Sequence, residues 1–302
     1  MKQTNMNVSI VGLGLIGGSV AKDLRKANFA THLIGVEASE AHAEEALRIN
    51  LVDEVLPLND AVAKSDLVVI AIPVDKIRQI LPQVLDQIQP GTTVTDLGST
   101  KQLIADVVEG HPKRRNYVAA HPMSGTENSG PSAAMDGLFE GKITIICDQE
   151  KSGPQHLALV EKMFQCLGMN IAYMSADEQD HSTAYISHLP HVVAYALANA
   201  AMSKENRHII FDLASGGFNS TVRLAKSTPS MWGPIFQDNQ KYIIESLDTY
   251  IKHLKEFRES ILNDEQRMYE LMENATKIRE VLGGANPSLI KNEEKIIKLY
   301  TK

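Results

Sequence analysis

The sequence predicts an α/β domain with a mostly parallel, doubly wound sheet, followed by an all-α domain. Three observations lead to this prediction. Strand-like apolar runs alternate with helix-like stretches over the first 150 residues, a glycine-rich loop separates the first strand from the first helix, and strand-like runs disappear after about residue 175. Such alternation is typical of crossover units in a parallel sheet. We therefore expect one domain over residues 1–174 and a helical domain over residues 175–302.

The N-terminal domain contains six runs with the composition of strands and four helix-like stretches between them. The run over residues 67–72 is apolar throughout, as expected of a strand that is buried on both faces. The predicted strands cover residues 7–11, 32–36, 67–72, 92–96, 117–119 and 142–147, and the predicted helices cover residues 17–27, 39–49, 75–88 and 100–109.

The C-terminal domain shows only helical patterns. They cover residues 176–202, 205–214, 220–227 and 231–280, and the last has an apolar stripe with charged residues opposite. Pro190 lies inside the first of these helices. Because proline has no N–H to donate to the carbonyl of Ile186, we expect a kink there. The tail beyond Gly284 is expected to form a short helix or to fray.

The loop after the first predicted strand reads Gly12-Leu13-Gly14-Leu15-Ile16-Gly17. Between a strand and a helix, this spacing is the dinucleotide-binding fingerprint of a Rossmann domain. Gly12 permits a tight turn, Gly14 lets the backbone approach a pyrophosphate, and Gly17 lets the helix pack closely on the strand. The pyrophosphate then faces the N–H groups at the helix N-terminus. We therefore predict NAD as the cofactor, with Leu15 and Ile16 among its contacts.

Glu37 follows the second predicted strand, twenty residues after Gly17. A carboxylate at this position accepts hydrogen bonds from the ribose hydroxyls of the cofactor. It would repel a 2′-phosphate, and no Arg or Lys follows until Arg48, so NAD is favoured over NADP. Further cofactor contacts are expected at the carboxyl ends of the other strands, where Pro73 and Ser99 lie.

Two groups of polar residues lie where a reactive centre is expected. His121 follows the strand over residues 117–119, and we expect it in a loop that faces the cofactor. In the helical half, Ser187 and His191 are four residues apart and share one helix face. Two interpretations of His191 stay open, a functional residue or a hydrogen-bonded histidine of the core.

Composition argues against several classes of protein. The net charge of −7 disfavours a nucleic-acid partner, because phosphate binding needs a basic surface. No apolar run approaches the ~20 residues of a membrane span, and the N-terminus has no signal-peptide pattern. We interpret Cys147 and Cys166 as small core residues of a cytoplasmic protein. No metal is expected, because His181, His188 and His191 lack the spacing of common metal-binding motifs.

Five motifs in two domains resemble the prephenate dehydrogenase family, which includes arogenate and cyclohexadienyl dehydrogenases. The resemblance extends over most of residues 7–280. Its motifs are Gly12-Leu13-Gly14-Leu15-Ile16-Gly17-Gly18-Ser19, Asp96-Leu97-Gly98-Ser99-Thr100-Lys101, His121-Pro122-Met123-Ser124-Gly125-Thr126-Glu127, Ser187-His188-Leu189-Pro190-His191, and Gly216-Gly217-Phe218 with Arg223 and Met231-Trp232.

The resemblance implies the NAD-dependent oxidative decarboxylation of prephenate to 4-hydroxyphenylpyruvate in tyrosine biosynthesis. It implies that His121 is the catalytic histidine, which takes the proton of the ring hydroxyl, and that Ser99 helps to hold that hydroxyl. It further implies a homodimer through the helical domain. By the same resemblance, Arg223 binds a substrate carboxylate, and the other substrate-pocket residues are His191, Ser187, Thr126, Glu127, Gly216 and Trp232.

Several alternatives stay open. Arogenate, which carries an amino group where prephenate has a keto group, is an alternative substrate. A β-hydroxyacid dehydrogenase usually takes a lysine from its helical half as the acid or base, and a non-catalytic NAD-binding redox sensor would leave His121, His191 and Arg223 unexplained. Many family members also carry a regulatory ACT domain or a chorismate mutase. We expect neither here, so any inhibition by tyrosine should occur by competition at the active site.

Overall fold

The computed structural model describes residues 6–205 and 207–284. The chain divides into two compact units, residues 1–239 and 240–302. The first contains the sheet and all helices up to α11 (Pro229–Asp238). The second contains α12 (Gln240–Asn263), α13 (Glu265–Thr276) and α14 (Ile278–Gly284). The domain boundary after residue 174 stays a prediction.

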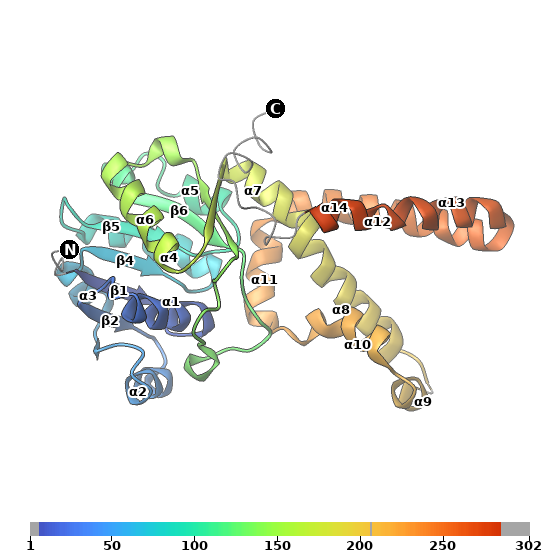
Figure 1. Cartoon of the computed structure of the whole chain (residues 1–302), viewed down its shortest axis with the longest axis horizontal. Coiled ribbons are helices and arrows are strands. Elements are labelled where there is room, and N and C mark those ends of the chain that lie inside the picture. Colours follow the sequence, from blue (N-terminus) through green and yellow to red (C-terminus); the bar gives the residue numbers. More distant parts are fainter. Residues whose placement is uncertain (1–5, 206, 285–302) are drawn as a thin grey trace. The chain divides into compact units, whose positions relative to one another are not determined.

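An eight-stranded sheet organises the first unit, in the order β3-β2-β1-β4-β5-β6-β7-β8 (Figure 1). All neighbouring strands are parallel except β6 and β7, which confirms the mostly parallel sheet. The strands are β1 (Asn7–Val11), β2 (His32–Val36), β3 (Glu54–Val55), β4 (Leu67–Ile70), β5 (Thr93–Asp96), β6 (Tyr117–Pro122), β7 (Ile143–Cys147) and β8 (Asn170–Met174). The sequence did not predict β3 and β8, because β3 has two residues and β8 buries only one of its five.

Both faces of the sheet are covered, as a doubly wound fold requires. In β1, Val8 and Ile10 belong to one apolar core and Val11 belongs to the other. All four residues of β4 are buried, as the apolar run predicts. The first core includes residues of α1 (Leu15–Lys26), α2 (Glu40–Arg48) and α6 (Pro154–Cys166), and the second includes residues of α3 (Leu58–Lys64), α4 (Val74–Gln87) and α5 (Gln102–Asp106).

The first helical stretch after the sheet changes its pitch near Pro190. It consists of α7 (Ala176–Thr183), the π-helical turn η4 (Ala184–His188) and α8 (Leu189–Met202). The π-helical turn lies directly before Pro190, whose missing N–H interrupts the regular helical bonding. The helices α9 (Arg207–Asp212) and α10 (Gly216–Val222) and the 3-10 turn η5 (Arg223–Lys226) lead to α11.

The prediction of one helix over residues 231–280 is wrong. The helix ends at Asn239 and again at Asn263. Asp264 then begins α13 as its N-cap, because its side chain accepts a hydrogen bond from the N–H of Arg267 at 2.9 Å. The interpretation of Cys166 as a core residue is also wrong, since Cys166 is exposed and only Cys147 is buried. Among the described residues, none of the helices has both the length and the apolar character needed to cross a membrane.

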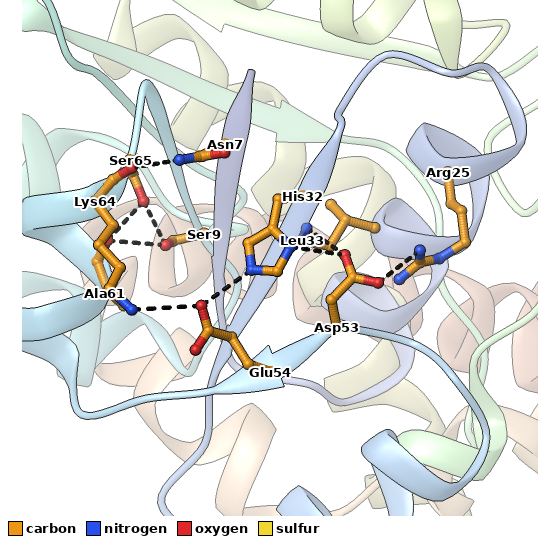
Figure 2. A network of polar contacts seen from close by, with 10 residues as sticks. All are labelled: Asn7, Ser9, Arg25, His32, Leu33, Asp53, Glu54, Ala61, Lys64 and Ser65. Carbon is orange, nitrogen blue, oxygen red and sulfur yellow. Dashed lines mark hydrogen bonds and ion pairs between the residues drawn. The ribbon is translucent and has the colours of Figure 1, made fainter. Parts of the chain in front are cut away.

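A polar network ties the start of β2 to α1 and to the segment that enters β3 (Figure 2). Asp53 accepts a hydrogen bond from the N–H of Leu33 at 2.7 Å and lies 2.9 Å from the guanidinium of Arg25. His32 lies between Asp53 and Glu54, with its Nε2 3.0 Å from the Glu54 carboxylate. Burial alone would raise the pKa of Asp53, but the bonds from Leu33 and Arg25 outweigh it, and the pKa is lowered.

We expect Asp53→Asn to lower the free energy of unfolding by about 1–2 kcal/mol at neutral pH. The pKa of Asp53 is lower in the folded protein than its unfolded value of about 3.9. Its contribution is therefore present above that value and is lost as the pH falls through the folded-state pKa. Urea denaturation should show the difference between variant and wild type shrinking below about pH 4.

The control for this prediction is Asp86→Asn, because the Asp86 side chain is 74% exposed beside His111. This control should change the free energy of unfolding by less than about 0.5 kcal/mol. A difference for Asp53→Asn that stays constant between neutral and acidic pH would contradict the prediction.

Candidate active site

A cavity of about 650 Å³ lies at the carboxyl ends of β1, β4, β5 and β6. Its lining includes Gly14, Leu15 and Ile16 after β1, Pro73 after β4 and Ser99 after β5. In the sheet order, β1 lies between β2 and β4. The strand order reverses at this place, and open α/β sheets bind their ligands at such a topological switch point. The volume is within the range of small-molecule sites.

The glycine loop has the close approaches that its sequence predicts. Gly12 has a φ of +93°, and a Cβ atom there would lie 2.6 Å from the carbonyl oxygen of Ala71. A Cβ atom on Gly17 would lie 2.0 Å from the carbonyl oxygen of Gly12. A side chain at Gly12 would therefore collide with the segment after β4, and one at Gly17 would push α1 away from β1 and the loop. Neither glycine lines the cavity, and both act by shaping the loop.

The N-terminus of α1 fits a dinucleotide. Gly14 is the N-cap of the helix and has no side chain to cap it, so the first N–H groups stay available for an anion. No heavy atom lies within 4 Å of the place where a Cβ atom on Gly14 would be. The Glu37 carboxylate accepts hydrogen bonds from the N–H groups of Leu13 at 3.0 Å and Ser39 at 3.1 Å. These bonds hold it beside the loop, although Glu37 does not line the cavity.

His121 lies on β6, and the prediction of a loop there is wrong. The antiparallel pairing with β7 continues through His121, opposite Ile145, to Pro122, opposite Thr144, so the strand is longer than its apolar run. The side chain is 8% exposed and lines the cavity. Its Nδ1 atom lies 3.0 Å from Nε2 of Gln179, a residue that the sequence analysis does not single out.

The surroundings of His121 favour the neutral imidazole. Burial lowers the pKa of His121 well below its ordinary value, and the positive charge of Lys101 and the nearby His188 lower it further. A neutral ring at physiological pH has one nitrogen with a lone pair and is able to accept a proton. His121 therefore has the protonation state that a general base needs.

The Lys101 charge is compensated by Asp96 at the end of β5. Both side chains are fully buried, and they form an ion pair. Asp96 also accepts hydrogen bonds from the Tyr117 hydroxyl at 2.6 Å and from the N–H of Gly98 at 2.9 Å. A buried ion pair persists when further hydrogen bonds satisfy its charges, as they do here.

His191 is both a hydrogen-bonded buried histidine and a residue of the cavity. Its ring stacks on the Trp232 indole with the centroids 3.4 Å apart. Its Nδ1 atom donates to the carbonyl of Ser187 at 2.9 Å, since a carbonyl only accepts. The lone pair of the neutral ring therefore lies on Nε2. All three residues line the cavity, so the hydrogen bonding of His191 does not exclude a functional role, which stays a prediction.

Arg223 and Glu127 bring opposite charges to the same cavity. The guanidinium of Arg223, at the start of η5, lies 3.3 Å from the Glu127 carboxylate. Their side chains are 53% and 36% exposed, so solvent screens this pair and it is weak. An anionic ligand is therefore able to replace Glu127 as the partner of Arg223.

The structure brings most of the predicted site residues to one cavity. Gly216 is not among the lining residues and begins α10. Within the described part of the chain, no three His, Cys, Asp or Glu side chains are grouped as metal ligands would be. The predicted residues that line the cavity are Gly14, Leu15, Ile16, Pro73, Ser99, His121, Thr126, Glu127, Ser187, His191, Arg223 and Trp232.

The fold and the cavity define a Rossmann-type dinucleotide-binding protein with a helical C-terminal region. Residues 20–173 match the nucleotide-binding domain of prephenate dehydrogenase, and residues 175–275 match its dimerization domain. The chain belongs to the prephenate dehydrogenase family.

Individual relatives agree with this assignment. The prephenate dehydrogenase of Bacillus subtilis is 30% identical over 93% of this chain and 77% of its own length. The cyclohexadienyl dehydrogenase of Zymomonas mobilis is 30% identical over 91% of this chain and 96% of its own length. The crystal structure of A. aeolicus prephenate dehydrogenase, in complex with hydroxyphenyl propionate and NAD+, has a TM-score of 0.85 and 30% identity, and it covers 93% of this chain and all of that chain.

Proposed function

We propose that this chain catalyses the NAD-dependent oxidative decarboxylation of prephenate to 4-hydroxyphenylpyruvate, a step of tyrosine biosynthesis. One observation carries the proposal: a buried, neutral His121 and the cationic Arg223 line the same cavity as the glycine loop. Such a cavity offers a cofactor site, a base and a cation for a substrate carboxylate. Family membership and the NAD+ and hydroxyphenyl propionate in the A. aeolicus structure support it.

The cofactor contacts follow from the loop geometry. The N–H groups at Gly14, Leu15 and Ile16 would hold the pyrophosphate, and Glu37 would accept the ribose hydroxyls. Pro73 and Ser99 would lie toward the nicotinamide. When bound, NAD supplies the hydride acceptor. A 2′-phosphate would meet the negative charge of Glu37, so activity with NAD should exceed activity with NADP.

His121 acts as the base in this proposal. Prephenate is a cyclohexadienol with two carboxylates, and His121 takes the proton of the ring hydroxyl as the carbinol C–H bond breaks. The bond to the ring carboxylate then breaks and carbon dioxide leaves. The electron pair completes the aromatic ring, and the ring oxygen takes the proton back from His121 to form the phenol. Because aromatisation drives the loss of carbon dioxide, the reaction needs no further electron sink.

The substrate carboxylates and side chain would be held by the groups around His191. Arg223 pairs a carboxylate better than a lysine would, because its guanidinium donates two parallel hydrogen bonds. The Trp232 Nε1 atom is buried and meets no acceptor within the described residues, and its indole stacks on the His191 ring. Thr126, Ser187 and the Nε2 atom of His191 complete the polar lining.

The test is an assay of NADH formation with purified protein, NAD and prephenate. We expect NADH and carbon dioxide in equal amounts, and a lower rate with NADP. A β-hydroxyacid should give no NADH. The absence of NADH with both prephenate and arogenate would overturn the proposal.

Arg223→Ala should mainly affect substrate binding. A charge-assisted hydrogen bond is worth about 1.5–3 kcal/mol, which predicts an increase in KM of about 10- to 100-fold with a smaller change in kcat. Steady-state kinetics with prephenate would measure both. Lys226→Ala on the same turn is the control, because Lys226 does not line the cavity. An unchanged KM in Arg223→Ala would remove this residue from the substrate site.

Arogenate is a second candidate substrate, and Glu127 is the observation that favours it. An ammonium group on the substrate side chain would pair with a carboxylate in the cavity, whereas the keto group of prephenate would not. The ratio of kcat/KM for the two substrates, measured in wild type and in Glu127→Gln, separates them. A preference for arogenate should fall in the variant, and a preference for prephenate should not.

We also propose that the helical region forms a homodimer, as the match to the dimerization domain suggests. The α8 helix is largely apolar, yet only His191 and Ala194 are buried in the single chain. Apolar side chains such as Leu197 and Met202 are exposed on the same helix. A surface of this kind is typical of a subunit interface. Sedimentation equilibrium of the purified protein should give twice the mass of the chain.

A further inference from the structure

Gln179 lies fully buried on α7, directly behind His121. The position of α7 is fixed beside the active-site loop. The next residue, Asp180, accepts hydrogen bonds from the N–H groups of Lys101 at 2.7 Å and Gln102 at 2.9 Å. The Gln179 side chain is therefore held by its own helix against the wall of the cavity.

The orientation of the Gln179 amide is set by a carbonyl group. Its Nε2 atom lies 3.2 Å from the carbonyl oxygen of Ser99, 3.0 Å from Nδ1 of His121 and 3.3 Å from Oγ1 of Thr183. A carbonyl oxygen only accepts, so the atom that faces Ser99 must be the N–H donor. The second hydrogen of the same nitrogen then points to His121, the nearest acceptor.

This bond determines which nitrogen of the His121 ring carries the proton. If Nδ1 accepts from Gln179, the single proton of the neutral ring is on Nε2. Nε2 is also the nitrogen that is left for the cavity. We infer that Gln179 is a positioning residue that sets the tautomer of His121, with the proton on Nε2 before substrate binds.

The reaction needs the other tautomer, and the same amide is able to supply it. This step rests on the proposed function, in which His121 is the base. To act as the base, the ring must present a lone pair at Nε2 and carry its proton on Nδ1. A half-turn of the Gln179 amide would place Oε1 against Nδ1 as its acceptor. In the structure Oε1 is buried and meets no donor among the described residues, whereas after the turn it would face the Ser99 carbonyl oxygen. In the observed orientation Oε1 has no donor, and in the turned orientation it faces another acceptor. Because neither orientation satisfies the hydrogen bonding of Oε1, we expect the amide to change between the two orientations.

The titratable groups around His121 and Gln179 come from three elements. Lys101 lies between β5 and α5, Asp180 lies on α7, and His188 lies on η4. The Lys101 cation is paired with Asp96, and His188 accepts from the Asn239 amide at 3.0 Å. None of these groups is hydrogen-bonded to the His121 ring in the structure, so Gln179 is the group that selects between its two nitrogens.

The direct test is ¹⁵N NMR of the histidine rings in substrate-free protein at pH 8. The ring-nitrogen shifts distinguish a nitrogen with a proton from one without, and His121→Asn identifies the resonances of His121. We expect Nε2 to be protonated in wild type. Gln179→Glu should reverse this pattern, because a carboxylate only accepts and would hold the proton on Nδ1 by accepting a hydrogen bond from it. A proton on Nδ1 of wild-type His121 would overturn the inference, whether or not the protein acts on prephenate.

Kinetics supply the second readout. A carboxylate at position 179 should stabilise the protonated ring of His121 and move the fall of kcat on the acid side to higher pH. Gln179→Met keeps the size of the side chain but loses the hydrogen bond, and kcat should fall about tenfold with KM within about twofold. Gln155→Met is the control, because the Gln155 amide also lies beside a histidine ring, 3.3 Å from Nε2 of His156, but does not line the cavity.

These results distinguish the inference from the proposed function. If Gln179→Glu does not fold, the wild-type NMR spectrum and the kinetics of Gln179→Met still test whether Gln179 sets the tautomer of His121. An inactive wild type with the expected tautomer would overturn the proposed function alone. Equal kcat values and pH profiles in wild type and Gln179→Met would overturn the role of Gln179.

Discussion

His121→Asn is expected to lower kcat with prephenate by about 10²–10⁴-fold, the usual effect of losing a general base. The asparagine amide has no nitrogen that titrates near neutral pH, so it cannot take the hydroxyl proton. It still offers an acceptor near the position of Nδ1 for the bond from Gln179. We therefore expect the fold to survive and KM to change by less than about threefold, since a group that acts only in the transition state changes kcat and kcat/KM equally.

His156→Asn is the matched control for this variant. His156 is 3% exposed and bonds Thr93, but it lies on α6 and does not line the cavity. Its replacement should lower stability and leave kcat unchanged. A His121→Asn enzyme with wild-type kcat would show that another group takes the proton.

The wild-type pH profile gives an independent check on His121. Burial and the Lys101 charge lower its pKa, so the ring stays neutral below the ordinary value of about 6.5. The fall of kcat on the acid side should therefore occur well below that pH. A fall centred at or above the ordinary value would mean that burial and the charge of Lys101 do not lower the pKa of the ring.

The nucleotide-binding part could be predicted because its signals are local. The loop over residues 12–17 combines three glycines whose spacing serves the turn, the pyrophosphate and the packing of α1, and Glu37 follows at the end of the next strand. The apolar run of β4 predicts its burial without reference to any other segment. The edge strands β3 and β8 lack such a signal, because their places depend on pairing with β2 and β7.

The two main errors have different causes. His121 was predicted in a loop because the apolar run ends at Ala120, and only the pairing with β7 shows that the strand continues. The sequence predicts a single helix over residues 231–280, because the apolar stripe continues past Asn239 and Asp264. Both asparagine and aspartate favour helix ends, and that local signal was outweighed by periodicity.

The candidate site was harder to predict because its residues meet only in three dimensions. The motifs that resemble the family pointed to His121 and Arg223, which are far apart in the sequence. Gln179 carries no motif, and nothing in its neighbourhood marks a residue that contacts a histidine 58 positions away. Lys101 lies within one of these motifs, but its role depends on burial beside Asp96, which the motif does not reveal.

Lys101→Met is expected to be the most destabilising of the substitutions considered. It removes the cation from a buried ion pair and leaves the Asp96 carboxylate with only Tyr117 and Gly98 as partners. Breaking a buried pair in this way costs about 3–5 kcal/mol, because the remaining charge is uncompensated. Urea denaturation at neutral pH would measure the loss. Lys151→Met is the control, since Lys151 is 36% exposed in its pairs with Glu109 and Asp148, and it should cost less than about 1 kcal/mol.

The same substitution tests the electrostatic link between the Lys101 pair and the catalytic histidine. Without the cation, the pKa of His121 should rise, because one of the two nearby groups that disfavour its protonated form is gone. The acid-side fall of kcat should then move to higher pH, while Lys151→Met leaves it in place. If Lys101→Met alone does not fold, the double variant with Asp96→Asn removes both charges and should recover part of the stability, and its pH profile replaces that of the single variant. A profile identical to wild type in a folded variant would show that the buried pair supports the fold and does not influence the base.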